Sequence, residues 1–105
     1  MNITNPRDMN PVYDREGVTG RRITAWRGVE IIQMDLEPGA LLAPHKTPFA
    51  VQFFIHRGPA VFLVGQEEIT LAEGAILDCP GHTPHGIRND TADRVTVLVI
   101  KHLQE

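Results

Sequence analysis

The sequence predicts an all-β domain, built as a small sandwich or barrel, and three observations lead to that fold class. Glycine and proline are frequent, with 9 and 8 among 105 residues, so the chain is interrupted too often for many long helices. No window shows a sustained helical repeat of apolar residues. Instead, about eight short segments alternate between apolar and polar residues, at spacings near ten residues.

The first strands follow an N-terminal segment that lacks regular patterning. Residues 1–20 are rich in Asn, Pro and Gly, and we expect them to form an irregular arm, with the barrel domain in residues 21–105. Residues 23–26 form a short candidate strand. Residues 29–37 alternate more clearly, and Glu37-Pro38-Gly39 ends them as a turn, because proline fixes φ and glycine accepts a positive φ.

Five further strands are expected along the rest of the chain, at residues 50–56, 60–64, 67–71, 75–79 and 94–101. Gly65-Gln66 joins two of them as a hairpin turn. The last strand is apolar on both faces, with valines on one face and Leu98 and Ile100 on the other. This pattern predicts that the last strand is covered on both sides.

The composition excludes several classes of partner. Ten Lys and Arg against 13 Asp and Glu give a net charge of −3, which is a poor match for nucleic acid. No apolar run approaches the roughly 20 residues that cross a bilayer, and the N-terminus lacks the pattern of a signal peptide. A single cysteine, Cys79, excludes an internal disulfide framework and fits a reducing cytoplasm. We therefore expect a cytoplasmic protein without nucleic-acid or membrane partners.

Five histidines carry the strongest functional signal. His45, His82 and His85 stand beside turns rich in Pro and Gly. Imidazole is the commonest protein ligand for transition metals, and a metal site on a β scaffold needs side chains that converge from different strands. His56 is expected to face outward from its strand, and His102 to be exposed in the polar residues 101–105.

Two segments resemble the motifs of the cupin superfamily. Residues 39–47, followed by Gly58, resemble the first motif, which runs G, five residues, H-x-H, three or four residues, E, six residues, G. Residues 74–89 resemble the second motif, G(x5)P-x-G-x-x-H-x-x-x-N, and four positions are in register: Gly74, Pro80, His85 and Asn89. Its inner glycine is replaced by His82. The resemblance implies a double-stranded β-helix, the cupin jelly-roll barrel.

The resemblance also implies a metal site, of which this sequence keeps only part. His45 matches the first His of the first motif, and His85 matches the His of the second. Thr47 stands where the second His would be. The place of the Glu is taken by Val51, or by Gln52 if the pairing slips by one residue. His82, three residues before His85, is a further candidate ligand that would partly replace the missing His.

The one-residue slip decides which face of strand 50–56 lines the barrel, because successive side chains point to opposite faces. If Val51 points inward, Phe53 and Ile55 do so as well, and the wall is apolar. If Gln52 points inward, His56 becomes available as a nitrogen ligand. We favour the first arrangement, because Val51, Phe53 and Ile55 make the better core face.

Three functions remain open from the sequence, and the third is a mainly structural or dimer-forming protein with a vestigial site. The first is a small cupin that binds a divalent metal ion (Fe, Mn, Ni or Zn) through His45, His82 and His85 and can act on a small molecule. The second is a metal-free module that binds or senses a small molecule, with Thr47, Gln52 and Phe53 as ligand-binding residues. Small cupins resemble one another in forming homodimers, and three apolar residues would suit such a contact: Phe54, Leu98 and Ile100.

Overall fold

The computed structural model describes residues 1–103, and nearly all of its regular structure is β-strand. A single turn of 3-10 helix, η1 (Pro6–Asp8), precedes the strands. The strands, in chain order, are β1 (Tyr13–Arg15), β2 (Val18–Trp26), β3 (Val29–Leu36), β4 (Leu41–His45), β5 (Ala50–Arg57), β6 (Ala60–Val64), β7 (Glu67–Leu71), β8 (Ile76–Cys79), β9 (His85–Arg88) and β10 (Val95–His102).

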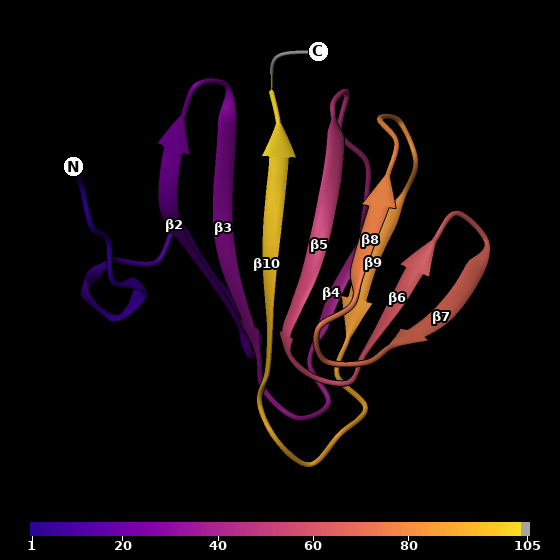
Figure 1. Cartoon of the computed structure of the whole chain (residues 1–105). Coiled ribbons are helices and arrows are strands. Elements are labelled where there is room, and N and C mark those ends of the chain that lie inside the picture. The colour runs from indigo at the N-terminus through magenta and orange to yellow at the C-terminus, as the bar shows by residue number, and fades with distance from the viewer. Residues whose placement is uncertain (104–105) are drawn as a thin grey trace.

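The strands form two antiparallel sheets that face each other (Figure 1). The large sheet has the order β1-β2-β3-β10-β5-β8, and the small sheet has the order β4-β9-β6-β7. This arrangement confirms the predicted all-β class and is consistent with the double-stranded β-helix. No helix among residues 1–103 is long and apolar enough to cross a membrane.

The two ends of the barrel differ in shape. The strands converge at the end formed by residues 37–40 and 89–94, which we call the closed end (Figure 1). They diverge at the other end, formed by the loops 46–49 and 80–84 and by the turn at residues 27–28, which we call the mouth (Figure 1). The chain therefore presents its two Pro–Gly-rich histidine segments at one end of the barrel.

The core fills the space between the sheets. Alternate residues of β5, which are Val51, Phe53 and Ile55, are at most 1% exposed, whereas Gln52 between them is half-buried on the other face. The favoured arrangement of this strand is thus confirmed. Phe53 packs against Phe62 of the opposite sheet, with ring centroids 5.0 Å apart, so aromatic contact holds the two sheets together.

The described chain has more strands than the sequence predicted, and β2 is longer than expected. The segments 60–64 and 67–71 are recovered as β6 and β7, but β1, β4 and β9 lay outside every expected strand. β4 contains Pro44, which cannot donate to a strand ladder, and its pairing with β9 is irregular between Leu42 and His45. A proline at an irregularity of an edge strand is compatible with pairing, so β4 persists.

The division into an arm and a barrel stays a prediction. β1 and the first residues of β2 lie within residues 1–20 and pair with each other in the large sheet. Val18 is 1% exposed and belongs to the hydrophobic core. The remaining N-terminal residues carry exposed apolar side chains, including Ile3 and Val12.

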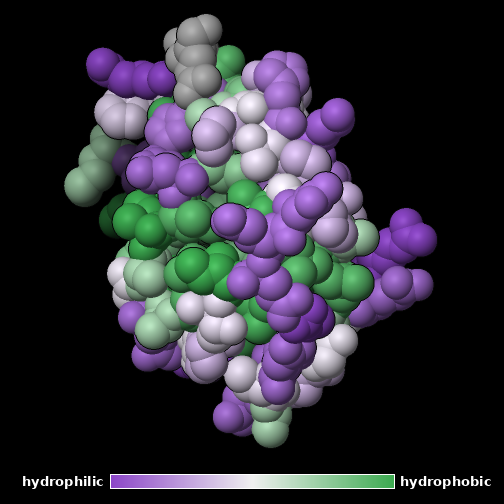
Figure 2. All heavy atoms as spheres, turned by 90° about the vertical axis from the view of Figure 1, so that its right-hand side faces the viewer, coloured by the Kyte–Doolittle hydropathy of each residue, from purple (hydrophilic) through white to green (hydrophobic). Residues whose placement is uncertain are grey.

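The outer surface is mixed rather than uniformly polar. Figure 2 shows the side on which β7 and β8 lie, where hydrophobic side chains gather between hydrophilic ones. Ile69 of β7 is 46% exposed, and Ile76 of β8 is 56% exposed. On the outer face of the large sheet, Ile76 lies opposite Phe54, which lies opposite Leu98, so an apolar row crosses three strands.

Candidate functional site

A pair of histidines lies at the mouth of the barrel. His45 ends β4 and His85 begins β9, and the two residues are direct partners in the small sheet. Their ring centroids are 4.6 Å apart, and the ring planes meet at 66°. His85 is only 3% exposed, whereas His45 is exposed. The two histidines that match the cupin motifs are therefore brought together from different strands, one inside the wall and one at its rim.

Backbone carbonyls orient both imidazole rings. His45 Nδ1 lies 3.2 Å from the carbonyl oxygen of Ala43, and His85 Nδ1 lies 3.1 Å from that of Thr83. A carbonyl oxygen can only accept, so each Nδ1–H donates, and in the neutral ring Nε2 keeps its lone pair. This is the arrangement by which proteins fix a histidine that binds a metal ion or a ligand through Nε2.

The surroundings of His85 favour its neutral form. Burial lowers the pKa of His85, and the positive charges of His45 and Lys101 lower it further, against the opposing hydrogen bond to Thr83. Cys79 Sγ lies 3.7 Å from His85 Nδ1, and burial raises the pKa of this thiol. His85 and Cys79 therefore present an uncharged nitrogen and an uncharged sulfur beside the core.

A glycine allows the histidine strands to approach each other. A Cβ atom on Gly86 would lie 2.7 Å from the carbonyl oxygen of Leu42 and 2.9 Å from the nitrogen of Pro44. Any other residue at this position would push β4 away from β9. The motif spacing gave no indication of this role, because the close approach depends on the irregular pairing of β4, which is visible only in three dimensions.

The wall beside the histidines is apolar. The ring of Phe53 lies 5.3 Å from that of His85, edge to face. Thr47 is half-buried at the rim, and its hydroxyl donates to the carbonyl oxygen of Phe49 at 2.9 Å. Phe53 thus lies directly against His85, and Thr47 lies in the loop that follows His45.

The remaining candidates lie further out. His82 is exposed at φ 64°, and its backbone N–H donates to the carbonyl oxygen of Thr47 at 2.7 Å, which joins the two mouth loops. Gln52 lies on the outer face of β5, where it donates to Asp78 at 2.9 Å and contacts His102 Nε2 at 2.7 Å. The expected exposure of His102 was wrong, because β10 extends to this residue and the side chain is half-buried; residues 104 and 105 lie outside the described part of the chain.

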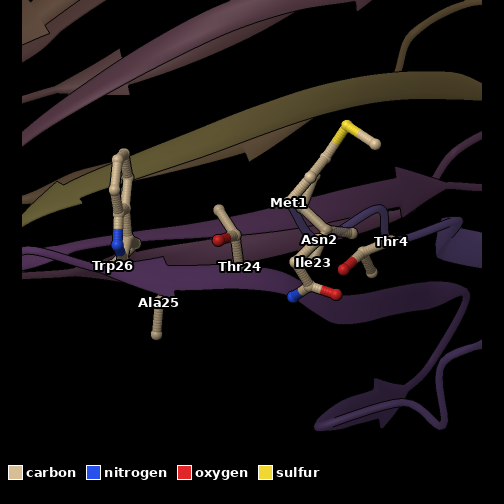
Figure 3. A pocket seen from close by; sticks show the side chains of 7 residues that line it. All are labelled: Met1, Asn2, Thr4, Ile23, Thr24, Ala25 and Trp26. Atoms are coloured by element: carbon tan, nitrogen blue, oxygen red, sulfur yellow. The ribbon is translucent and has the colours of Figure 1, made fainter.

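Surface hollows lie at the mouth and beside β2. One, of about 380 Å³, lies where β5, β8 and β10 reach the mouth, and its lining includes Val51, Gln52, Cys79 and His102. The other, of about 640 Å³, lies between the N-terminal residues and the outer half of β2 (Figure 3). In this hollow Thr24 and Trp26 point to one side of β2 and Ala25 to the other, and no histidine takes part.

Three charged side chains lie near the mouth on the inner face of the large sheet. Lys101 Nζ lies 3.5 Å from Glu30 Oε1, and Arg22 Nη1 lies 3.6 Å from Glu30 Oε2. Sequence reasoning missed this group, although the inward series of β10, in which Val97 and Val99 are buried, ends in a lysine. Among residues 1–103, no three His, Cys, Asp or Glu side chains are grouped so that they could hold a metal ion.

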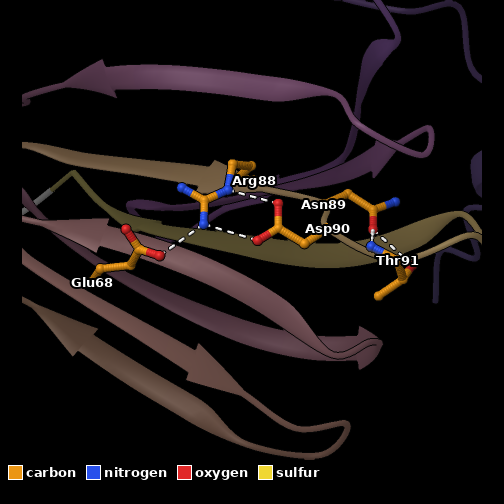
Figure 4. Close-up of polar contacts among 5 residues, drawn as sticks. All are labelled: Glu68, Arg88, Asn89, Asp90 and Thr91. Carbon is orange, nitrogen blue, oxygen red and sulfur yellow. Dashed lines mark hydrogen bonds and ion pairs between the residues drawn. The ribbon is translucent and has the colours of Figure 1, made fainter.

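Asn89 of the second motif directly follows β9, at the closed end of the barrel (Figure 4). Its side-chain nitrogen donates to the carbonyl oxygens of Leu36 at 2.9 Å and Asp93 at 2.7 Å. Its side-chain oxygen accepts from the backbone N–H and the hydroxyl of Thr91, at 2.9 and 2.7 Å. Asn89 is 0% exposed, so it closes the barrel and takes no part in the mouth.

The sequence matches the family model described as a cupin domain over residues 32–101. The chain belongs to the cupin family. The matched residues run from β3 to β10 and include both His45 and His85, so the resemblance predicted from the two motifs is confirmed. A search of curated proteins found no match to this cupin.

Solved structures share the fold over nearly the whole chain. The TT1209 protein of Thermus thermophilus has a TM-score of 0.82 and 24% identity, with both chains covered completely. A predicted oxalate decarboxylase of Thermotoga maritima has a TM-score of 0.84 and 16% identity, with 98% of this cupin and 100% of that chain covered. The polyketide cyclase RemF of Streptomyces resistomycificus has a TM-score of 0.81 and 14% identity, with 99% and 80% covered.

Proposed function

We propose that this cupin binds a small organic molecule at the mouth of its barrel, beside a divalent metal ion held by His45 and His85. The observation that carries the proposal is the pair itself: two rings 4.6 Å apart, each with its Nδ1 directed at a backbone carbonyl. The lone pair of each Nε2 atom is then available to bind a metal ion. Fold alone does not supply this function, since cupin-like barrels serve many roles.

The donor set fits a metal ion that takes two protein nitrogens and completes its shell with water or ligand oxygens. Neutral imidazole suits Zn, Ni or Fe, whereas Mn would depend more on the oxygens of water or ligand; the lowered pKa of His85 keeps its ring in the neutral form. A bound ion would supply Lewis-acid polarisation of a ligand oxygen. His82 is retained as a third candidate ligand, because its loop joins the one that follows His45.

The organic molecule would lie against the apolar wall. Phe53 packs behind the ring of His85 and makes the wall apolar there, and Thr47 stands at the rim. Gln52 lines the hollow of about 380 Å³ at the same end of the barrel. Two structural neighbours carry the names of a predicted oxalate decarboxylase and a polyketide cyclase, and these names support a small organic ligand as a proposal for this cupin.

Isothermal titration of chelator-treated protein with zinc, nickel and manganese tests the metal proposal. We expect one ion to bind per chain, and His45→Gln or His85→Gln to weaken binding at least tenfold. Weaker metal binding by His82→Gln in the same assay would identify His82 as a third ligand. His56→Gln is the matched control, because His56 is exposed and belongs to no contact of the pair. Equal affinities for the wild type and His85→Gln would refute the metal proposal.

A metal-free binding module is the second candidate function. It is favoured by the absence, within residues 1–103, of any three-membered group of metal-ligating side chains. In this case the two imidazoles would donate and accept hydrogen bonds with the organic molecule itself. A thermal shift on adding an organic ligand in the presence of chelator, with no shift on adding metal, would distinguish this module from the metal-binding cupin.

We also propose that the protein is a cytoplasmic homodimer that pairs through the outer face of the large sheet. The row formed by Ile76, Phe54 and Leu98 supplies a continuous apolar strip, and Ile100 extends it along β10. The buried, reduced Cys79 is compatible with the cytoplasm. Sedimentation equilibrium of the wild type and of Leu98→Lys tests the dimer, which the substitution should dissociate; a monomeric wild type would refute it.

A further inference from the structure

The strand register places a lysine where the barrel is otherwise apolar. In β10 the inward positions are Val95, Val97 and Val99, which are at most 6% exposed, and the next inward position is Lys101. Its partner in β3 is Glu30, which likewise follows the buried Ile32 in the inward series. Charged groups on an inward face cost desolvation free energy, so both residues stand at the mouth, where that face opens.

Lys101 lies on the same inner surface as the histidine pair. Residues directly opposite each other on antiparallel strands direct their side chains to the same face. Lys101 is opposite Val51, and Val51 is opposite Cys79, whose sulfur lies 3.7 Å from His85. The row from Lys101 to Cys79 therefore leads across the sheet to His85.

The ion pairs around Glu30 leave binding capacity unused. Two cations share this one carboxylate, at 3.5 Å for Lys101 and 3.6 Å for Arg22, and each reaches only one oxygen. On the outer surface of the same molecule, Arg88 and Glu68 approach to 2.7 Å, the distance of a charge-assisted hydrogen bond. The ammonium of Lys101 and the guanidinium of Arg22 thus keep donors available for a second acceptor, and the three groups together carry one net positive charge.

We propose that Lys101 and Arg22, held around Glu30, bind the carboxylate of a small organic acid at the mouth of the barrel. This inference rests on the proposed function, because it names the chemical class of the molecule that the mouth takes. A carboxylate offers two oxygens in a plane to the fork of Arg22 and carries the single negative charge that this group lacks. Each carboxylate group of such an acid brings one negative charge, whereas a phosphate dianion carries about two charges on a single group, more than these three residues balance.

The test is a titration of chelator-treated protein that is uniformly labelled with the heavy nitrogen isotope. Binding is monitored through the amide resonances in two-dimensional NMR spectra. Succinate and its neutral amide, succinamide, are the matched probes. We expect succinate to shift the amides of residues 30, 51 and 101 saturably and succinamide to leave them unchanged. Lys101→Met should weaken succinate binding at least tenfold, and Lys101→Arg should retain most of it.

Matched controls separate the mouth from general surface charge. Arg22 and Arg94 both pair with a glutamate, and both side chains are 56% exposed, but Arg94 pairs with Glu37 at the closed end. Arg22→Gln should weaken succinate binding severalfold, and Arg94→Gln should not change it. Glu30→Gln removes the competing carboxylate and should strengthen binding, which keeps the proposal testable if Lys101→Met fails to fold.

Several outcomes would overturn the proposal. These are equal shifts with succinamide, equal weakening by Arg94→Gln and Arg22→Gln, weaker binding in Glu30→Gln, or inorganic phosphate binding as tightly as succinate. A zinc titration of the same samples tests the histidine pair separately. Zinc binding without succinate binding refutes the carboxylate site alone, and succinate binding without zinc binding supports it while refuting the metal ion.

Discussion

The closed end and the mouth of the barrel use polar groups in opposite ways. At the closed end, Asn89 is 0% exposed, and its amide makes four hydrogen bonds of 2.7–2.9 Å. At the mouth, Glu30 holds two cations at 3.5 and 3.6 Å, and His45 is exposed. The donors at the closed end are satisfied within the chain, whereas those at the mouth retain capacity for a molecule from outside.

This difference separates residues that hold the fold from residues that serve a ligand. A buried polar group with a partner for every donor and acceptor stabilises one structure, and its loss leaves those partners unsatisfied. A half-exposed group with long contacts contributes little to stability and is free to bind. Substitutions at the two ends should therefore affect different measurements.

The largest expected effect is on stability, from Asn89→Ala. The substitution removes a buried hydrogen bond to the carbonyl oxygen of Leu36, one of the two side-chain donors to the carbonyl oxygen of Asp93, and the acceptor of Thr91. We expect the free energy of unfolding to fall by about 3 kcal/mol or more. Urea denaturation followed by circular dichroism measures it, with Asn10→Ala as the control, because Asn10 is exposed. A loss below about 1 kcal/mol would show that water replaces these hydrogen bonds.

Gly86→Ala should combine a moderate loss of stability with loss of the site. Its Cβ atom would contact the backbone of Leu42 and Pro44 below 3.0 Å, so β4 must move away from β9. We expect the free energy of unfolding to fall by about 2 kcal/mol and zinc affinity to fall at least tenfold. The control is Gly74→Ala, which strains a positive φ but has no atom within 4 Å. If Gly86→Ala binds zinc as tightly as Gly74→Ala and the wild type, the close approach at Gly86 is not needed for the histidine pair.

The same contrast explains how much the sequence could predict. The alternation of Val51, Phe53 and Ile55 fixes the inner face of β5, and motif spacing brings His45 to His85, because both signals are local or evenly spaced. The role of Gly86 depends on the backbone of another strand, and that of Lys101 on pairing with Glu30 seventy-one positions away. Such contacts arise from register between distant segments, which no local pattern encodes.

A smaller effect concerns Asp90, beside the closed end. The guanidinium of Arg88 donates to both carboxylate oxygens, at 2.7 and 2.8 Å, and lowers the pKa of Asp90 below its ordinary value of 3.8 (Figure 4). Because the folded-state pKa is the lower one, the stabilisation is complete above about pH 3.8 and is lost as the pH falls through the lowered pKa.

Carboxyl-carbon NMR titration of the folded protein measures this shift. Arg88→Gln should return the pKa of Asp90 towards 3.8, because hydrogen bonding to Arg88 is the main cause of the shift. Glu68→Gln should leave the pKa of Asp90 low, since Glu68 contacts Arg88 from the other side. An unshifted pKa in the wild type would contradict the pairing seen in Figure 4.

The smallest expected effect is the response of Cys79 to alkylation, and it defines where the mouth ends. Cys79 is 2% exposed, burial raises its pKa, and its thiol lies against His85 as part of the packed wall. Iodoacetamide at pH 8 should not label the native protein and should label one thiol per chain in urea, because only the exposed thiolate reacts. Mass spectrometry distinguishes the two. Rapid labelling of the native chain would mean that solvent reaches the row behind Val51, and that the open region extends from Lys101 across the whole inner face.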